Sequence, residues 1–167
     1  APVATVRAGT SGLDNLSGTA AASDYFVLSP GADVLTGAGG VDVFAWPQST
    51  TNNPVQPTTI KDFGLQRATG GLQGSTEADI LDLSHLLTGY ASTTRSQYLQ
   101  LSQDSNGKLV MNIDRDGGST FEATESVLFD NITVNSGGNL VVNNAATSYS
   151  MGNLLDQLIA DAQLQVS

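Results

Sequence analysis

The stretch Gly37-Ala38-Gly39-Gly40-Val41-Asp42-Val43-Phe44-Ala45 decides the fold of this chain, because it joins a glycine-rich turn to a short apolar segment. Its aspartate is the last of four at nearly regular spacing. Asp24, Asp33 and Asp42 follow one another at intervals of nine residues, and Asp14 precedes Asp24 by ten. A large apolar residue stands two positions after each aspartate: Leu16, Phe26, Leu35 and Phe44. This fixed phase argues against a chance run of the turn-forming residues Asp and Gly.

Repeats of this type match the nonapeptide G-G-x-G-x-D-x-U-x of parallel β-rolls. Glycine allows the positive φ angles that such turns need. Stacked turns direct carbonyl and carboxylate oxygens toward one another, and calcium binds about six to eight oxygen ligands. The apolar residue of each strand faces inward, where one repeat alone cannot bury it. The repeats therefore predict a short calcium-binding parallel β-roll over residues 9–46.

Beyond the roll, the sequence predicts further strands and one helix. Apolar and polar residues alternate over residues 97–114 around the turn 104–107, as in a β-hairpin. Other strands are expected at 59–63, 80–83, 126–129 and 140–142, with a helical turn at 84–87. Apolar residues at helical spacing predict an amphipathic helix over 151–162, followed by a short extended end. The fold class is all-β: a short calcium-binding parallel β-roll continued into antiparallel β-strands, with a C-terminal amphipathic helix.

We divide the chain into four parts on this basis. Residues 1–8 are expected to form a tail or linker and residues 9–46 the roll. Residues 47–150 form a β-sandwich-like extension of the roll, which contains a proline-rich loop at 47–58 and a glycine-rich loop at 64–76. Residues 151–167 hold the C-terminal helix. The chain shows no N-terminal signal peptide. It begins with Ala1-Pro2-Val3, without Met, so we expect a fragment of a longer protein.

Composition excludes several classes of protein. The chain has 167 residues, enough for one domain, with 16 acidic and 6 basic residues and a net charge of −10. Such a chain is a poor nucleic-acid binder. It contains no cysteine, and no apolar run approaches the roughly 18 residues of a membrane helix, so we expect no membrane insertion. Repulsion among its carboxylates would oppose folding without a cation and be relieved by calcium.

Three further segments extend the pattern: Thr59-Ile60-Lys61-Asp62-Phe63, Ala78-Asp79-Ile80-Leu81-Asp82-Leu83-Ser84 and the apolar tail Leu154-Leu155-Asp156-Gln157-Leu158-Ile159. With the repeats, they resemble the RTX (repeats-in-toxin) family, and in particular the C-terminal target domain of large bacterial adhesins exported by type I secretion. The resemblance covers most of residues 9–167, and the repeats are its specific part. It implies a non-enzymatic, calcium-binding, monomeric module of a secreted or cell-surface protein that acts in cell adhesion and biofilms.

The resemblance also implies calcium ligands. In this family, each ion takes turn carbonyls and the aspartate of one repeat, together with those two repeats later. Carried over, a first site would use Thr10, Gly12, Asp14, Leu28, Pro30 and Asp33. A second would use Ala20, Ala22, Asp24, Gly37, Gly39 and Asp42. Aspartates of the later segment also close the roll in this family. Asp62, Asp79 and Asp82 would then complete sites with Ser29, Gly31 and Asp33, or with Ala38, Gly40 and Asp42.

The C-terminal helix has two compatible interpretations. Solenoids need caps, so the helix is expected to cover the open end of the β-domain. The family also carries its export signal in an uncleaved C-terminus, which the ABC transporter of type I secretion recognises. The resemblance therefore implies that transporter as the partner during export. It assigns the signal to Leu154, Leu155, Leu158 and Ile159.

Other functions stay open at this stage. An accessory β-roll of a secreted hydrolase, such as a metalloprotease or a lipase, would look similar, and a ligand-binding adhesin module is a further alternative. Tyr25, Phe44 and Trp46 could stack on a sugar, although Phe44 occupies a core position of its repeat. Residues 114–118 could form an ion loop, but a hairpin turn is the preferred interpretation. His85 is the single histidine and lacks the partners of a catalytic or zinc site.

Overall fold

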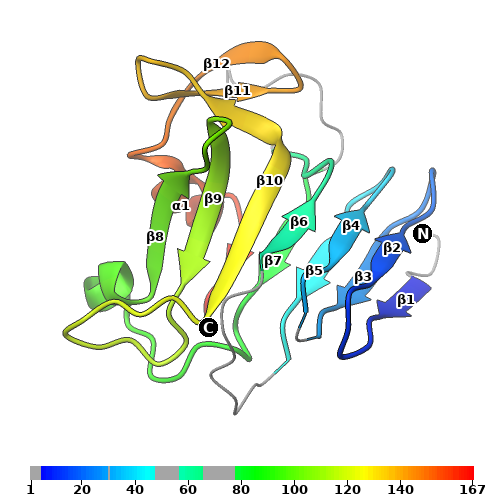
Figure 1. The fold of residues 1–167 in the computed structure, drawn as a ribbon, viewed down its shortest axis with the longest axis horizontal. Helices are drawn as coiled ribbons and strands as arrows, with labels where there is room; N and C mark the ends of the chain where they lie inside the picture. The colour runs from blue at the N-terminus through cyan, green and yellow to red at the C-terminus, as the bar shows by residue number, and fades with distance from the viewer. Residues whose placement is uncertain (1–4, 30, 48–56, 66–77) are drawn as a thin grey trace.

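A computed structural model describes residues 5–29, 31–47, 57–65 and 78–167. As the chain advances, its first seven strands alternate between two sheets (Figure 1). Sheet A is entirely parallel and contains, in spatial order, β1 (Thr5–Ala8), β3 (Asp24–Val27), β5 (Val43–Ala45), β7 (Ile80–Asp82) and β13 (Leu164–Gln165). Sheet B begins with β2 (Asn15–Ser17), β4 (Val34–Thr36) and β6 (Thr58–Ile60), which are also parallel. This alternation confirms the predicted parallel β-roll.

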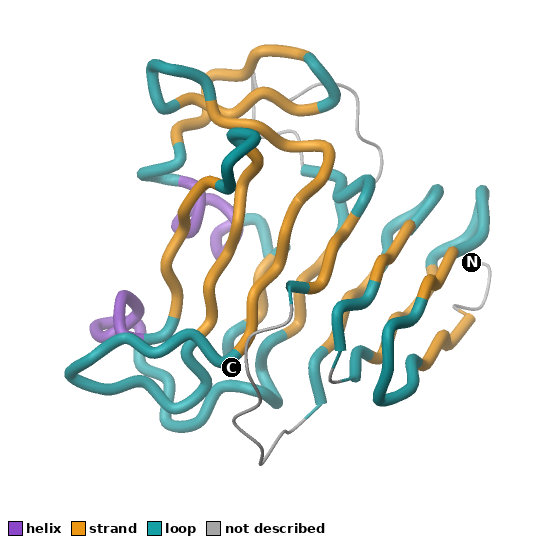
Figure 2. The backbone as a smooth tube through the Cα atoms, in the orientation of Figure 1, coloured by secondary structure: helices purple, strands orange, loops and turns teal. Residues whose placement is uncertain are grey.

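Sheet B then changes from parallel to antiparallel pairing. The long strand β10 (Glu125–Val134) pairs in parallel with β6 and antiparallel with β9 (Lys108–Ile113) and β11 (Asn139–Val142). The hairpin of β8 (Leu99–Gln103) and β9 confirms the prediction for 97–114, and β12 (Ala145–Ser150) completes the sheet beside β11. Figure 2 shows loops along both edges of the roll and the larger antiparallel part beside it.

The repeats bury their apolar residues as predicted. Phe26, Leu35 and Phe44 are 0% exposed, whereas Leu16, in the edge strand β2, is partly buried. A row of aromatic rings leads from the roll into the antiparallel part. The ring centroids of Phe26 and Phe44 are 4.9 Å apart, those of Phe44 and Phe63 are 6.3 Å apart, and those of Phe63 and Phe129 are 5.2 Å apart. One continuous core therefore joins the two parts of the domain.

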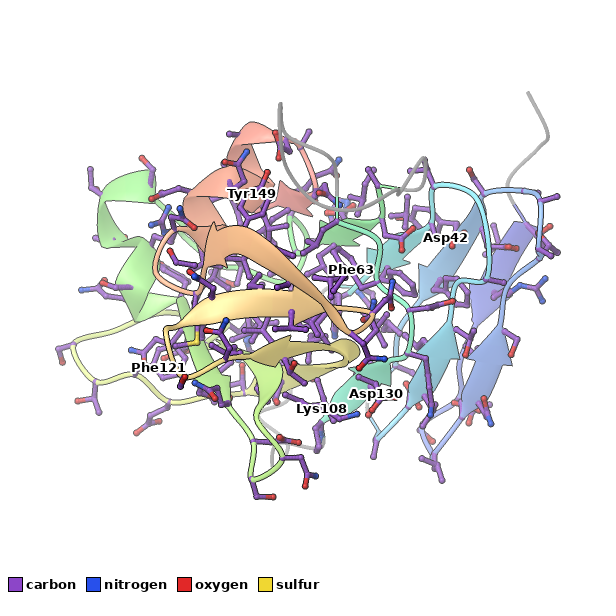
Figure 3. All side chains as sticks on the ribbon, turned by 90° about the horizontal axis from the view of Figure 1, so that it is seen from above. Asp42, Phe63, Lys108, Phe121, Asp130 and Tyr149 are labelled. Atoms are coloured by element: carbon purple, nitrogen blue, oxygen red, sulfur yellow. The ribbon has the colours of Figure 1, made fainter. Side chains whose placement is uncertain are left out.

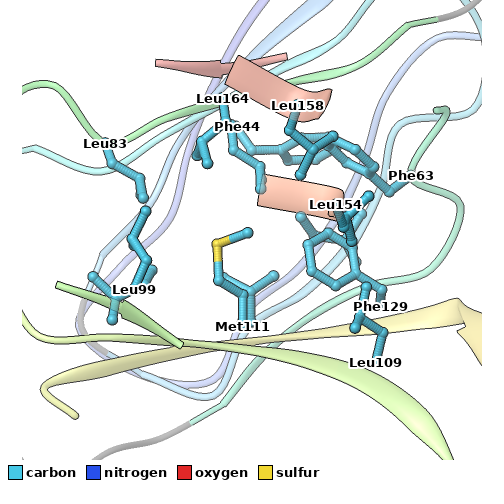
Figure 4. Packing of buried hydrophobic residues seen from close by; sticks show 14 of the residues in the cluster. Phe44, Phe63, Leu83, Leu99, Leu109, Met111, Phe129, Leu154, Leu158 and Leu164 are labelled. Carbon is cyan, nitrogen blue, oxygen red and sulfur yellow. The ribbon is translucent and has the colours of Figure 1, made fainter. Parts of the chain in front are cut away.

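The C-terminal segment belongs to that core. The helix α1 (Leu154–Ala160) buries Leu154 and Leu158, and β13 buries Leu164 (Figure 4). The helix is shorter than the predicted 151–162, because residues 151–153 form a turn and Ala162 has a φ of 57°, in the left-handed region. No helix among the described residues is long and apolar enough to cross a membrane.

Several elements differ from the expectation or were missed. Residues 5–8, expected in a tail, form β1 through parallel pairing with β3. The strand β12 and the 3-10 helix η1 (Ser92–Gln97) were not predicted. The parallel contact between β10 and β6 was also missed, because residues more than 60 positions apart give no local signal of their pairing. The predicted loops at 47–58 and 64–76 lie largely outside the described residues.

Candidate metal centre

The aspartates of the repeats form two columns, one at the start of each sheet's strands. Along sheet A, the backbone N–H of Asp24 donates to Asp42 Oδ1 (2.8 Å), and that of Asp42 donates to Asp79 Oδ1 (2.9 Å). Along sheet B, the backbone N–H of Asp14 donates to Asp33 Oδ1 (3.0 Å). In each case, a carboxylate accepts a hydrogen bond from the backbone N–H of the aspartate that occupies the same place in the preceding turn. The columns place buried like charges beside one another.

The second carboxylate oxygen of several aspartates closes its own turn. The N–H of Thr10 donates to Asp14 Oδ2 (2.5 Å), and the N–H of Thr19 donates to Asp24 Oδ2 (2.6 Å). Asp33 departs from this pattern. Its Oδ2 is buried and has no hydrogen-bond partner among the described residues. An unpartnered buried carboxylate oxygen is costly, and a cation at this position would remove the cost.

The turns stack closely enough to bring the predicted carbonyl ligands together. Ser29 Oγ donates to Thr10 O, and a Cβ added to Gly31 would lie 2.5 Å from Gly12 O. In the next stack, a Cβ at Gly40 would lie 2.7 Å from Ala22 O. Gly31 and Gly40 have φ angles of 146° and 106°, so both their conformation and the space around them require glycine.

These contacts group the predicted ligands into two stacks. The stack before sheet B contains Thr10, Gly12, Asp14, Leu28, Ser29, Gly31 and Asp33, while Pro30 lies outside the described residues. The stack before sheet A contains Ala20, Ala22, Asp24, Gly37, Ala38, Gly39, Gly40 and Asp42. Figure 3 shows Asp42 in the roll, away from the antiparallel strands.

Two of the three later aspartates join the stack before sheet A. Asp62 accepts the N–H groups of Gly37 (2.8 Å) and Ala38 (2.9 Å), and Asp79 contacts Asp42 as described above. Asp82 is placed differently. It pairs with Ala45 at the opposite end of β5 from Asp42, and its Oδ1 accepts the N–H and hydroxyl of Ser84. Asp62 and Asp79 thus contact the turns of the roll. Asp82 instead stabilises a local turn with Ser84.

Burial and like charge perturb these carboxyl groups. Burial raises the pKa of Asp79 to about 7 against its hydrogen bonds from Gly64 and Asp42, and the charges of Asp42 and Asp62 raise it further. Burial raises the pKa of Asp33 as well; backbone hydrogen bonds from Asp14 and Ser29 oppose this rise, and the charge of Asp14 adds to it. Burial also opposes ionisation of Asp24, but hydrogen bonds from Thr19 and the ion pair with Arg7 (3.1 Å) outweigh it and lower the pKa.

Two residues missed by the sequence interpretation lie near these columns. Burial raises the pKa of Glu125 to about 7. The charge of Arg115 lowers this pKa, and the charge of Asp33 raises it. Glu125 is therefore close enough to the sheet B column to interact with Asp33. Gln163 precedes β13 as Asp79 precedes β7, and its Nε2 donates to Asp79 O (2.8 Å) and Gly64 O (2.7 Å). Neither lies in a glycine-rich repeat, so no local pattern could have revealed them.

The arrangement fits a hard cation. No three His, Asp or Glu side chains within the described ranges converge as a metal-binding group, so backbone carbonyls would have to supply most ligands. The stacked turns provide such carbonyls beside Asp14 and Asp33 and beside Asp24 and Asp42. Oxygen donors of this kind suit calcium and offer no nitrogen or sulfur for zinc.

The other candidate residues have structural roles or lack a site. Asp114 is buried and accepts the N–H groups of Asp116, Gly117 and Glu122, which supports the turn interpretation. Trp46 and Phe44 are both buried, so neither offers a free ring face to a sugar. His85 is exposed at the rim of a shallow apolar depression on sheet A, beside Tyr25 and Trp46.

A glycine-to-alanine pair tests the packing of the turns. A Cβ at Gly37 would lie 2.3 Å from Asp42 Oδ2, whereas one at Gly12 would have no neighbour closer than 3.9 Å. Gly37→Ala is therefore expected to lower the free energy of unfolding by about 1–3 kcal/mol, as overpacking does. Gly12→Ala is the matched control and should leave it nearly unchanged. Urea unfolding in saturating calcium measures both, and equal losses would contradict this packing.

A pH series tests the buried carboxyls in calcium-depleted protein that a stabilising osmolyte such as sucrose holds folded. Burial raises the pKa of Asp79 from about 3.8 in the unfolded chain to about 7 in the folded domain, and that of Glu125 from about 4.5 to about 7. Between these values, the folded state holds protons that the unfolded state has lost. The stability of the folded state is therefore expected to fall as the pH rises from about 4 to 7, by up to about 1.4 kcal/mol per pH unit for each group. Circular dichroism during thermal unfolding measures this, and stability that rises with pH would contradict it.

Comparisons with known proteins add a likeness to a solved structure. No protein-family model matches the chain, and no curated protein matches it either. The solution structure of the AlgE6R3 subunit from the Azotobacter vinelandii mannuronan C5-epimerase is 17% identical, with a TM-score of 0.44, over 73% of this chain and 72% of that chain. At this identity and TM-score, the likeness says nothing about function.

Proposed function

We propose that this domain is a non-enzymatic, calcium-dependent C-terminal module of an RTX adhesin exported by type I secretion. One observation carries the proposal: two columns of stacked aspartates lie beside backbone carbonyls of neighbouring turns, and Asp33 Oδ2 in one column is buried with no hydrogen-bond partner among the described residues. Like charges in such columns destabilise a cation-free fold. Bound calcium would supply the compensating positive charge.

Linkage between binding and folding would make the module respond to its surroundings. A ligand that binds the folded state alone stabilises it by RT ln(1 + [L]/Kd). Extracellular calcium modules have Kd values of about 10⁻⁴–10⁻³ M, so such sites are empty in the cytosol and largely filled outside the cell. The chain would then remain unfolded for passage through the transporter. It would fold on emergence, where Asp14 and Asp33, and Asp24 and Asp42, would hold the ions.

The C-terminal segment fits the same sequence of events. Leu154 and Leu158 are buried in the folded domain, while Leu155 and Ile159 are partly exposed. If the transporter reads these four residues, it can reach all of them only before the domain folds. Export and folding would therefore exclude each other, and calcium would decide between them. Early folding outside the cell would also keep the chain from sliding back.

A calcium titration of EGTA-treated protein, followed by far-UV circular dichroism, tests the proposal. We expect a cooperative gain of β signal with calcium and none at equal magnesium concentrations. Asp42→Ala should shift the calcium midpoint to a concentration about tenfold higher or more, which corresponds to about 1.4 kcal/mol. Asp116→Ala removes the same charge from an exposed loop residue and should leave the midpoint unchanged. A chain that is fully folded without calcium and indifferent to it would refute the proposal.

A further inference from the structure

A polar pocket of about 370 Å³ lies apart from the aspartate columns, where the roll meets the antiparallel strands. Its wall combines charged, amide and hydroxyl side chains from four places in the chain. These are Lys61 after β6, Lys108 in β9, Asp130 and Thr133 in β10, and Asn143 and Asn144 between β11 and β12. The volume falls within the range of about 300–1,000 Å³ that small-molecule sites occupy.

A bulge in β10 creates the pocket. Phe129 pairs with Leu109, but the next pair is Thr133 with Lys108, so residues 130–132 have no counterpart in β9. Bulges of this kind redirect side chains and recur next to functional sites. The opposite wall is the turn Asn143–Asn144, whose φ angles of 51° and 63° are typical of a two-residue hairpin turn. The bulge in β10 and the hairpin turn thus face the same pocket.

The bulge and the turn are fixed to each other. The side-chain amide of Asn131 donates to Phe63 O (3.0 Å), at the end of the roll, and to Asn143 Oδ1 (3.3 Å), in the turn. Phe63 O is an acceptor, so this contact also fixes the orientation of the Asn131 amide. The walls of the pocket are therefore held in place without a ligand, which reduces the ordering cost of binding.

The pocket contains a cluster of three charged side chains, two lysines and one aspartate. The chain has two lysines, Lys61 and Lys108, and both contact Asp130. Lys108 Nζ donates to Asp130 Oδ1 and to its backbone oxygen (3.0 Å), and Lys61 Nζ lies 3.5 Å from Oδ2. The cluster carries one net positive charge in a chain whose net charge is −10. Ion pairs this exposed contribute about 0–1 kcal/mol, so stability alone gives little reason for the cluster.

We propose that this pocket binds a neutral saccharide through its hydroxyl groups. The wall interleaves donors, the ammonium and amide N–H groups, with acceptors, the Asp130 carboxylate and the amide oxygens. A hydroxyl group both donates and accepts, so neighbouring hydroxyls can use both kinds of partner. A carboxylate or phosphate would use the donors alone and would lie beside the like charge of Asp130. A metal cation would meet two ammonium groups.

The pocket also lacks the features of an apolar site. Among the residues that the structure describes, Val141 is its one apolar lining residue, and no aromatic ring lines it. A saccharide would therefore bind by hydrogen bonds rather than by stacking. The proposal does not depend on the calcium columns, because none of the pocket residues belongs to them.

Two-dimensional NMR of the folded, calcium-saturated domain tests the proposal. The probes are the methyl glycosides of glucose, galactose, mannose and N-acetylglucosamine, with glucuronate and inorganic phosphate as anionic probes. We expect saturable shifts from at least one neutral glycoside, centred on the amides of Lys61, 130–133 and 143–144. Lys61→Gln and Asn144→Gly should each weaken binding about tenfold. Glycine tolerates the positive φ at position 144, and Lys61 is half exposed, so both variants should fold.

The matched control is Arg95→Gln, which removes one positive charge from an exposed ion pair with Asp156, outside the pocket. It should leave binding unchanged. The proposal is overturned if no neutral glycoside gives saturable shifts at the pocket, if the anions bind and the glycosides do not, or if Arg95→Gln weakens binding as much as Lys61→Gln.

Discussion

Phe63→Ala is expected to lower the free energy of unfolding by about 3–5 kcal/mol, as large-to-small substitution of a buried aromatic residue does. Phe63 is 1% exposed, and its ring lies between those of Phe44 in the roll and Phe129 in β10. Removing it would open a cavity at the junction of the two parts of the core, where neither side can close the gap without breaking its own strand pairing. This loss is a large fraction of the 5–15 kcal/mol that stabilises a typical domain.

Guanidinium unfolding in saturating calcium measures this loss, provided that the slope of the transition is unchanged. Phe121→Ala is the matched control, because Phe121 lies in the loop between β9 and β10, outside the core cluster (Figure 3). It should cost far less. If the Phe63 variant unfolded in two separate transitions, the roll would be stable alone and the junction would be an interface between domains. A loss no greater than that of Phe121→Ala would contradict the role of Phe63.

The roll could be predicted from the sequence because each repeat carries its own information. The spacing of Asp33, Leu35, Asp42 and Phe44 determines which residues turn and which point inward, and the structure buries all four. The hairpin of β8 and β9 was predictable for the same reason, since its alternation and its turn are local. Even so, Ala38 has a φ of 72° where glycine would be less strained, so the consensus does not report every strained position.

The remaining topology depends on contacts that have no local signature. Glu125 lies near the sheet B column because β10 pairs with β6, and Gln163 ends the sheet A column because β13 pairs with β7. The polar pocket was missed for a related reason. Lys61 and Asp130 are far apart in sequence, and a bulge that no composition reveals brings Asp130 to the surface that Lys61 faces. Calcium binding, export and the adhesin role stay predictions.

Deletion of residues 154–167 is expected to prevent stable folding even in saturating calcium. It removes Leu154, Leu158 and Leu164, each 2% exposed, and full burial of one leucine contributes about 1.5–3 kcal/mol. It also removes the hydrogen bonds that Gln163 donates to Asp79 O and Gly64 O, and it leaves β7 as an edge strand of sheet A that pairs with β5 alone. The summed loss approaches the whole stability of a typical domain.

Circular dichroism and urea unfolding of the truncated protein would measure this effect. Deletion of residues 166–167 alone is the matched control, because it shortens the same terminus beyond β13 and should leave the domain folded. A stable, calcium-responsive protein without residues 154–167 would mean that the helix is an appendage, free to act as an export signal after folding. Loss of folding would instead mean that the residues assigned to the signal also complete the core, so that the transporter must read them before the domain exists.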